Sequence, residues 1–243
     1  MAYKISLNYS PNFGSKKRKK NQIKFIIFHY TGMKSEKAAI KRLTDVKSNV
    51  SCNYFIKKNG DIIKIVPDLY VAWHAGISSW KRDKHINLNS IGVEISNPGH
   101  KHGYKNFNPR QIGSVIKLTR KLKKKYKIKK ENILGHSDIA PERKKDPGEK
   151  FPWKKLAKVN LAIWHKLNEI DLKKRRLKVL NREEEKFFLK NLYIFGYNKI
   201  KKCNTNLNKK FIITAFQRRF RQSLINGKSD QECFLISKNL LKT

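Results

Sequence analysis

The run IKFIIFHY (Ile23–Tyr30) decides the fold that we expect for this chain. It is short, apolar and rich in β-branched and aromatic residues, which is typical of a buried strand. The polar turn HYTG (29–32) follows directly and ends the apolar run. The expected strand therefore carries a histidine, His29, at its end.

Further strand and helix patterns alternate outward from this run. Strands are predicted in the hairpin-like CNYFIKKNGDIIKIV (52–66), in SIGVEIS (90–96) and in NILGH (132–136), which ends in a histidine. Helices are predicted at 35–48 with Ser35 as N-cap, at 109–127 starting with Pro109, and at 153–169. This order predicts an α/β fold with a mixed central β-sheet flanked by helices.

The chain is expected to divide into three parts. Residues 1–22 are predicted to be an irregular N-terminal arm, and residues 23–170 to form the α/β domain. The stretch 171–178 is basic and poor in apolar residues, so the boundary is placed there. Residues 179–243 contain three helical patterns and no strand pattern, which predicts a small C-terminal three-helix module.

The charge is strongly positive, with 57 Lys and Arg against 18 Asp and Glu, a formal net charge of +39. A polyanionic partner, an acidic substrate and a coding bias toward Lys, Ile and Asn are three alternatives. The lysines are spread along the chain, so we expect no specific nucleic-acid partner. The sequence shows neither a signal-peptide core nor an apolar run of membrane-span length, which favours the cytoplasm, with a periplasmic or wall-associated location as the alternative.

Three candidate metal ligands lie at strand ends or in the loops after them: His29, His136 and Asp146. Two imidazoles and one carboxylate suit Zn²⁺ with an open fourth position. A histidine at a strand end is also often just a hydrogen-bonded polar residue, so the spacing leaves both interpretations open. Glu94 lies within an apolar strand pattern, where an unpaired carboxylate is costly unless a nearby metal accounts for it.

Four motifs occur in one order: HYTG (29–32), AWHAGIS (72–78), SIGVEISN (90–97) and GHSDIAPERKKDPGEKFPW (135–153). Together they resemble the type-2 N-acetylmuramoyl-L-alanine amidase family, whose fold is shared with peptidoglycan-recognition proteins. The resemblance covers roughly residues 20–165. It implies a zinc amidase domain at 23–170 that cuts the amide bond between N-acetylmuramic acid and L-alanine in peptidoglycan or muropeptide fragments.

The resemblance also implies roles for individual residues. His29, His136 and Asp146 would bind one zinc ion per chain, and Glu94 and Lys144 would be catalytic. Glu94 suits proton transfer and Lys144 suits stabilisation of an oxyanion. His74, Trp73 and Asn87 are expected to contact substrate. For His74, holding the loop by hydrogen bonds is an equal alternative, and Trp80 and Trp153 are candidates either for sugar stacking or for the core.

The segment 211–240 resembles the second half of a peptidoglycan-binding module. Its apolar face would consist of Phe216, Phe220, Leu224 and Ile225. The alternative is a basic helical bundle that packs on the amidase domain and binds nothing. Two other functions compete with the enzyme: a non-catalytic peptidoglycan-recognition protein, which typically lacks a zinc ligand, and a nucleic-acid-binding protein. We expect a monomer that acts on 1,6-anhydromuramyl peptides or on intact peptidoglycan.

Overall fold

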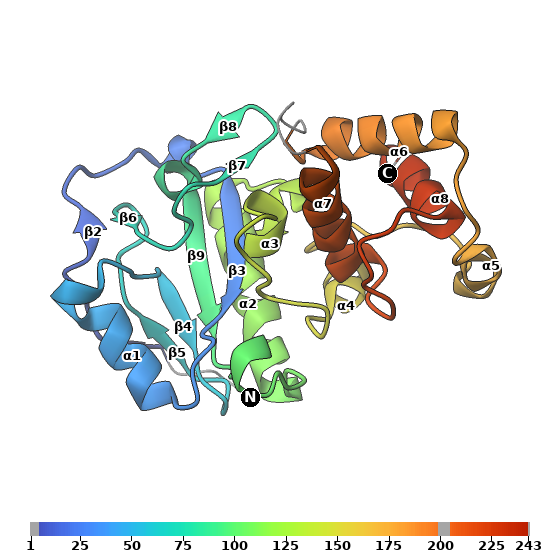
Figure 1. Ribbon diagram of the computed structural model, residues 1–243. Helices are drawn as coiled ribbons and strands as arrows, with labels where there is room; N and C mark the ends of the chain where they lie inside the picture. Colours follow the sequence, from blue (N-terminus) through green and yellow to red (C-terminus); the bar gives the residue numbers. More distant parts are fainter. Residues whose placement is uncertain (1–4, 199–204, 243) are drawn as a thin grey trace.

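A six-stranded mixed sheet forms the centre of the molecule (Figure 1). The computed structural model describes residues 5–198 and 205–242. The strand order is β1 (Ile5–Leu7), β5 (Ile62–Lys64), β4 (Tyr54–Ile56), β9 (Ser90–Ile95), β3 (Phe25–Tyr30) and β10 (Ile133–Gly135). Neighbouring strands run parallel except β4 and β5, which form the predicted antiparallel hairpin. The predicted fold class is confirmed.

Eight α-helices are present in the described part of the chain. They are α1 (Glu36–Thr44), α2 (Pro109–Tyr126), α3 (His136–Ile139), α4 (Trp153–Lys158), α5 (Glu169–Arg175), α6 (Arg182–Phe195), α7 (Thr205–Phe220) and α8 (Gln231–Leu240). The Ser35 hydroxyl caps α1 by accepting from the Ala38 amide, as predicted. Asn108 and Gln111 form a capping box directly before and within the first turn of α2. No helix in the described ranges is long and apolar enough to cross a membrane.

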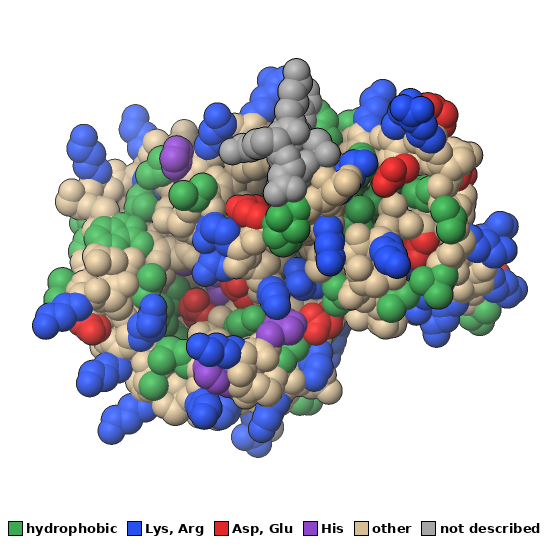
Figure 2. Space-filling view, in the orientation of Figure 1, with side chains coloured by type: hydrophobic (Ala, Val, Ile, Leu, Met, Phe, Trp, Pro, Cys, Tyr) green, Lys and Arg blue, Asp and Glu red, His purple; other side chains and the backbone are tan. Residues whose placement is uncertain are grey.

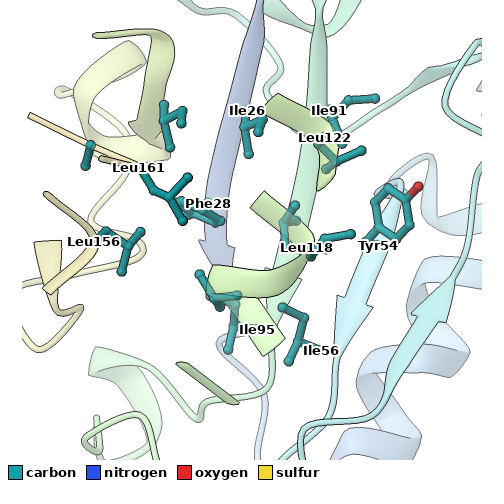
Figure 3. Packing of buried hydrophobic residues seen from close by; sticks show 14 of the residues in the cluster. Ile26, Phe28, Tyr54, Ile56, Ile91, Ile95, Leu118, Leu122, Leu156 and Leu161 are labelled. Atoms are coloured by element: carbon teal, nitrogen blue, oxygen red, sulfur yellow. The ribbon is translucent and has the colours of Figure 1, made fainter. Parts of the chain in front are cut away.

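One face of the sheet is covered by α2 and carries one large apolar cluster (Figure 3). Because side chains alternate along a strand, Ile26 and Phe28 of β3 point to this face. They pack against apolar residues of β9, α2 and the α4 region, including Ile91, Ile95, Leu118, Leu122, Leu156 and Leu161. On the opposite face, Phe25 and Ile27 of β3 belong to a second apolar cluster, and His29 and Glu94 lie near the ends of β3 and β9.

The N-terminal arm is more ordered than the sequence predicts. Residues 1–4 lie outside the described residues, but β1 pairs with β5 at the edge of the main sheet, and β2 (Phe13–Gly14) pairs with β6 (Val71–Ala72). The β1 side chains are exposed, so backbone pairing rather than an apolar pattern forms this strand. The Arg18 guanidinium is buried and donates to the carbonyls of Asp68, Asn87 and Leu88. The expectation of an irregular arm is therefore wrong.

Short elements complete the α/β part. β7 (Ser79–Trp80) and β8 (Asp83–Lys84) form a small antiparallel pair. Turns of 3₁₀-helix lie at Lys20–Gln22, Val46–Ser48, Ile86–Asn89, His100–His102 and Lys130–Asn132.

The predicted helix at 153–169 is wrong in length, because α4 ends at Lys158. Asn160 adopts a left-handed backbone with φ 58°, which stops the helix. The next three residues, Leu161–Ile163, are all buried, and three consecutive buried residues suit an irregular segment between two packed layers. Trp80 and Trp153 are also buried, at 0% and 2% exposure, so both belong to the core and neither stacks on a sugar.

The C-terminal helices pack directly on the α/β part rather than standing apart (Figure 1). The three helices predicted within 179–243 are present as α6, α7 and α8, and α5 occupies most of the expected linker at 171–178. Phe216 and Phe220 are buried against Phe25, Ile27 and Leu134 in one apolar cluster. Leu224 and Ile225 lie in the loop after α7 and are half-buried. Gly196, with φ 148°, lets the Trp80 ring lie against its backbone, where a Cβ would be 2.3 Å from Trp80 Cε2.

A buried ion pair joins α7 to α3. Arg219 Nη1 donates to Asp138 Oδ2 at 2.6 Å, and both side chains are about 1% exposed. The other Asp138 oxygen accepts from the Tyr197 hydroxyl at 2.8 Å. Oδ2 also accepts from the Gly135 amide at 2.8 Å. This carboxylate therefore ties the C-terminal helices to the turn that precedes His136.

Arg219→Met is expected to lower the free energy of unfolding by about 3–5 kcal/mol, because it leaves the Asp138 charge buried without its cation. Denaturant unfolding of the full chain measures this. Arg175→Met, at an exposed position on α5, is the matched control and should stay within about 0.5 kcal/mol of the parent protein. Adding Asp138→Asn to Arg219→Met should recover part of the loss, and an unchanged stability of the single variant would contradict the role assigned to the pair.

Candidate active site

The register of β3 and β9 explains why a glutamate occurs within an apolar strand. His29 is the direct partner of Glu94, and Ile27 and Phe25 are the partners of Gly92 and Ser90. Side chains alternate across a strand, so Ile91, Val93 and Ile95 enter the core under α2 while Ser90, Gly92 and Glu94 lie on the opposite face. The strand thus has one apolar face and one face that bears polar groups next to His29.

The adjacent strand β10 delivers the second histidine to the same edge. β10 runs parallel to β3, with Gly135 beside Phe28. His136 follows as the first residue of α3 rather than as the last residue of the strand, which corrects the expected strand 132–136 by one position. Asp146 comes from the loop after α3, and its carbonyl accepts from the Ser137 amide at 2.8 Å.

His29, His136 and Asp146 bring three ligand atoms together. His29 Nδ1 lies 2.9 Å from His136 Nδ1 and 2.9 Å from Asp146 Oδ2, and His136 Nδ1 lies 3.0 Å from the same oxygen. All three residues are buried. Two imidazole nitrogens and one carboxylate oxygen at the corners of so small a triangle match the three protein ligands of a catalytic zinc site.

Burial and mutual contact set the protonation of this cluster. Burial, followed by the neighbouring His136, lowers the pKa of His29 to about 4. Burial would raise the pKa of Asp146, but the adjoining His136 and His29 overcome it and hold that pKa well below its usual range. A neutral His29 and an ionised Asp146 are the states in which these side chains bind a metal.

Glu94 lies beside the cluster with a shifted pKa. Burial, together with the nearby charge of Asp146, raises the pKa of Glu94 to about 8, and the charge of Lys144 opposes the rise. Within the described residues, Oε2 of Glu94 is buried without a hydrogen-bond partner. A carboxylate left without a partner next to possible metal ligands is typical of a group that exchanges a proton during a reaction.

A cleft of about 760 Å³ opens above these residues, within the size range of small-molecule sites. Figure 2 shows the hollow, with acidic and histidine side chains in its depth and Lys and Arg side chains around it. The basic residues that line it are Arg42, Lys101, Arg143, Lys144 and Lys145. Lys144 is half-buried and lies close enough to Glu94 to affect its pKa. The cleft therefore suits an anionic ligand.

Of the three residues expected to contact substrate, two line the cleft and one does not. Trp73 and His74 line the cleft. His74 Nδ1 also lies 3.0 Å from His29 Nε2. Asn87 is absent from the cleft lining, and its Oδ1 accepts from the amides of His74 and Ala75.

Two groups near the cluster are not predicted from the sequence. The Ala75 carbonyl lies 3.1 Å from His136 Nε2, and Arg143 Nη2 donates to the same carbonyl at 3.0 Å. A backbone carbonyl leaves no signal in the sequence. Arg143 lies in a run of charged residues where nothing distinguishes it from its neighbours.

Comparison with known proteins gives a consistent result. The family described as N-acetylmuramoyl-L-alanine amidase matches residues 19–149. The N-acetylmuramoyl-L-alanine amidase AmiD of Escherichia coli (strain K12) is 34% identical over 233 residues, which are 91% of this chain and 83% of that protein. The 1,6-anhydro-N-acetylmuramyl-L-alanine amidase AmpD of Enterobacter cloacae is 35% identical over 107 residues, 44% of this chain and 55% of that protein.

Solved structures extend the likeness to the C-terminal helices. E. coli AmiD in complex with the substrate anhydro-N-acetylmuramic acid-L-Ala-D-gamma-Glu-L-Lys has a TM-score of 0.81 at 33% identity and covers 94% of this chain and 91% of its own. AmpDh3 of Pseudomonas aeruginosa in complex with anhydromuramic pentapeptide has a TM-score of 0.79 at 27% identity, with 94% of both chains covered. The likeness of sequence and of structure, over nearly the whole length, shows that this chain belongs to the N-acetylmuramoyl-L-alanine amidase family.

Proposed function

We propose that this amidase binds one zinc ion through His29 Nδ1, His136 Nδ1 and Asp146 Oδ2. The family is zinc-dependent in general, and the three ligand atoms lie within 2.9–3.0 Å of one another. The donor set supports zinc over magnesium or calcium, which prefer oxygen ligands alone. A zinc ion bound there would lower the pKa of a water molecule and polarise the substrate carbonyl.

Glu94 is the proposed proton carrier. Its carboxylate takes a proton from the attacking water and donates it to the departing amine of L-alanine. A pKa raised toward neutrality suits both halves of this transfer, because the group then gives up the proton as readily as it takes it. Lys144, which lines the same cleft, stabilises the negative charge that develops on the carbonyl oxygen.

The proposed substrate is a muramyl peptide, as N-acetylmuramic acid or its 1,6-anhydro form, cut at the amide bond to L-alanine. The AmiD and AmpDh3 structures that this chain resembles hold anhydromuramyl peptides. The basic cleft complements the carboxylates of a stem peptide. One chain supplies three metal ligands, a proton carrier and a cation to this cleft, so the proposed activity needs no residue from a second copy, and we propose an active monomer.

The observation that carries the proposal is the juxtaposition of the three ligand atoms with Glu94, whose buried Oε2 has no hydrogen-bond partner among the described residues. A peptidoglycan-recognition protein without catalysis would need neither an intact ligand set nor this glutamate. The test is elemental analysis of the purified protein, paired with cleavage of an anhydromuramyl peptide with and without a chelator. About one zinc per chain and chelator-sensitive release of a peptide beginning with L-alanine are expected. If the purified protein contains no zinc and cleaves no muramyl peptide, only the recognition function remains.

A further inference from the structure

A chain of hydrogen bonds runs from the backbone of the 86–90 turn to His29. Ser90 Oγ donates to the Ile86 carbonyl at 2.6 Å. A serine hydroxyl has a single proton, so its 3.1 Å contact with His74 Nε2 requires that nitrogen to be the donor. His74 is therefore protonated on Nε2, and its Nδ1 carries a lone pair that can accept a hydrogen bond on the side away from Ser90.

The second half of the chain determines the tautomer of His29. His74 Nδ1 accepts from His29 Nε2 at 3.0 Å, so the proton of the His29 ring resides on Nε2. The lone pair of His29 is then on Nδ1, the atom that faces His136 and Asp146. In the opposite tautomer of His74, two lone pairs would face each other across the 3.1 Å contact with Ser90, because the serine proton is already given to Ile86.

Ala75, the residue after His74, fixes the tautomer of His136 in the same way. The Ala75 carbonyl accepts from His136 Nε2 at 3.1 Å, which leaves His136 Nδ1 to face the cluster. Asn87 Oδ1 holds this short segment by accepting from the His74 and Ala75 amides at 3.1 and 2.7 Å. Space for the His74 ring comes from Gly92, since a Cβ there would lie 2.4 Å from His74 Cγ.

We propose that His74 is a positioning residue, which together with Ser90 and Asn87 fixes the ring orientation and tautomer of the metal-binding histidines and does not recognise substrate. This inference rests on the proposed zinc site at His29, His136 and Asp146. Groups that accept the second N–H of a metal-bound histidine typically account for about 10–100-fold in metal affinity. Here the acceptor is another imidazole, whose own orientation is held by a serine.

The test is the zinc dissociation constant, measured by competition with a chromophoric chelator. His74→Phe keeps the ring shape but removes both hydrogen bonds, and it should weaken zinc binding about 10–100-fold. His74→Asn should recover most of the affinity, because its Oδ1 occupies the position of Nδ1 along the side chain and accepts from His29. Ser90→Ala removes the partner that selects the tautomer and should show a smaller loss. His102→Phe is the matched control for zinc binding, because His102 lines the same cleft but is not among the three residues whose ligand atoms lie together.

A second readout separates positioning from substrate binding. At saturating zinc, KM for an anhydromuramyl peptide should stay within about twofold in His74→Asn, whose link to His29 is intact. A raised KM with an unchanged zinc dissociation constant in His74→Phe would overturn the proposal and make His74 a substrate contact. If His74→Phe does not fold, as judged by circular dichroism without metal, the zinc dissociation constants of His74→Asn and Ser90→Ala test the proposal instead. Absence of zinc binding in the parent protein would instead overturn the proposed function, and this inference with it.

Discussion

Glu94→Gln is expected to lower turnover of a muramyl peptide by about 10²–10⁴-fold while leaving about one zinc per chain. The substitution keeps the size of the side chain but removes its ability to take up a proton. Glu94 is not one of the three proposed zinc ligands, so the zinc content should not change. Steady-state kinetics together with elemental analysis measure both quantities on the same sample.

The matched control for this variant is Glu131→Gln, which makes the same chemical change in the 3₁₀ turn at Lys130–Asn132, outside the cleft lining. It should leave turnover within about twofold. Near-normal turnover in Glu94→Gln would remove Glu94 as the proton carrier. A loss of zinc together with activity would show instead that Glu94 contributes to the metal site.

Asp146→Ala is expected to abolish both zinc binding and activity. It removes the only carboxylate among the three ligand atoms and leaves two buried imidazoles. The loss of metal affinity should exceed the roughly 10–100-fold that follows when only the outer partner of a ligand is removed. A chelator competition titration followed by a cleavage assay measures the two effects in turn.

Asp171→Ala, at an exposed position on α5, controls for the loss of one carboxylate and should keep full zinc content. Adding excess zinc to Asp146→Ala should restore little turnover. A variant that still holds one zinc per chain at micromolar metal would exclude Asp146 from the ligand set.

Local patterns were sufficient to predict the central strands and the long helix. IKFIIFHY and SIGVEIS are apolar runs of strand length, and they became β3 and β9, while Pro109 and the following apolar spacing marked the start of α2. These elements are recognisable because burial imposes its periodicity directly on the sequence. β1 was missed because an exposed edge strand is formed by backbone pairing, which imposes no such periodicity.

The candidate site divides in the same way. Its side chains are named by sequence motifs, but their functional arrangement depends on register: His29 and Glu94 are 65 positions apart and become neighbours only because β3 and β9 pair in parallel. The difference between a substrate contact and a positioning role for His74 and Asn87 is likewise a matter of which atoms lie within 3 Å. A sequence specifies residue types, whereas a hydrogen bond requires distance and direction.

The sequence by itself determined the α/β class, the motifs of the amidase family and the identity of the polar residues at the strand ends. Three features came from the tertiary structure alone: the C-terminal helices share a core with the sheet, Asp138 and Arg219 join the two parts, and His74 and Ala75 of one short loop contact His29 and His136. The physical reason is that local periodicity records burial along one element. Contacts between elements distant in the chain depend on how those elements pack, and no local pattern records that.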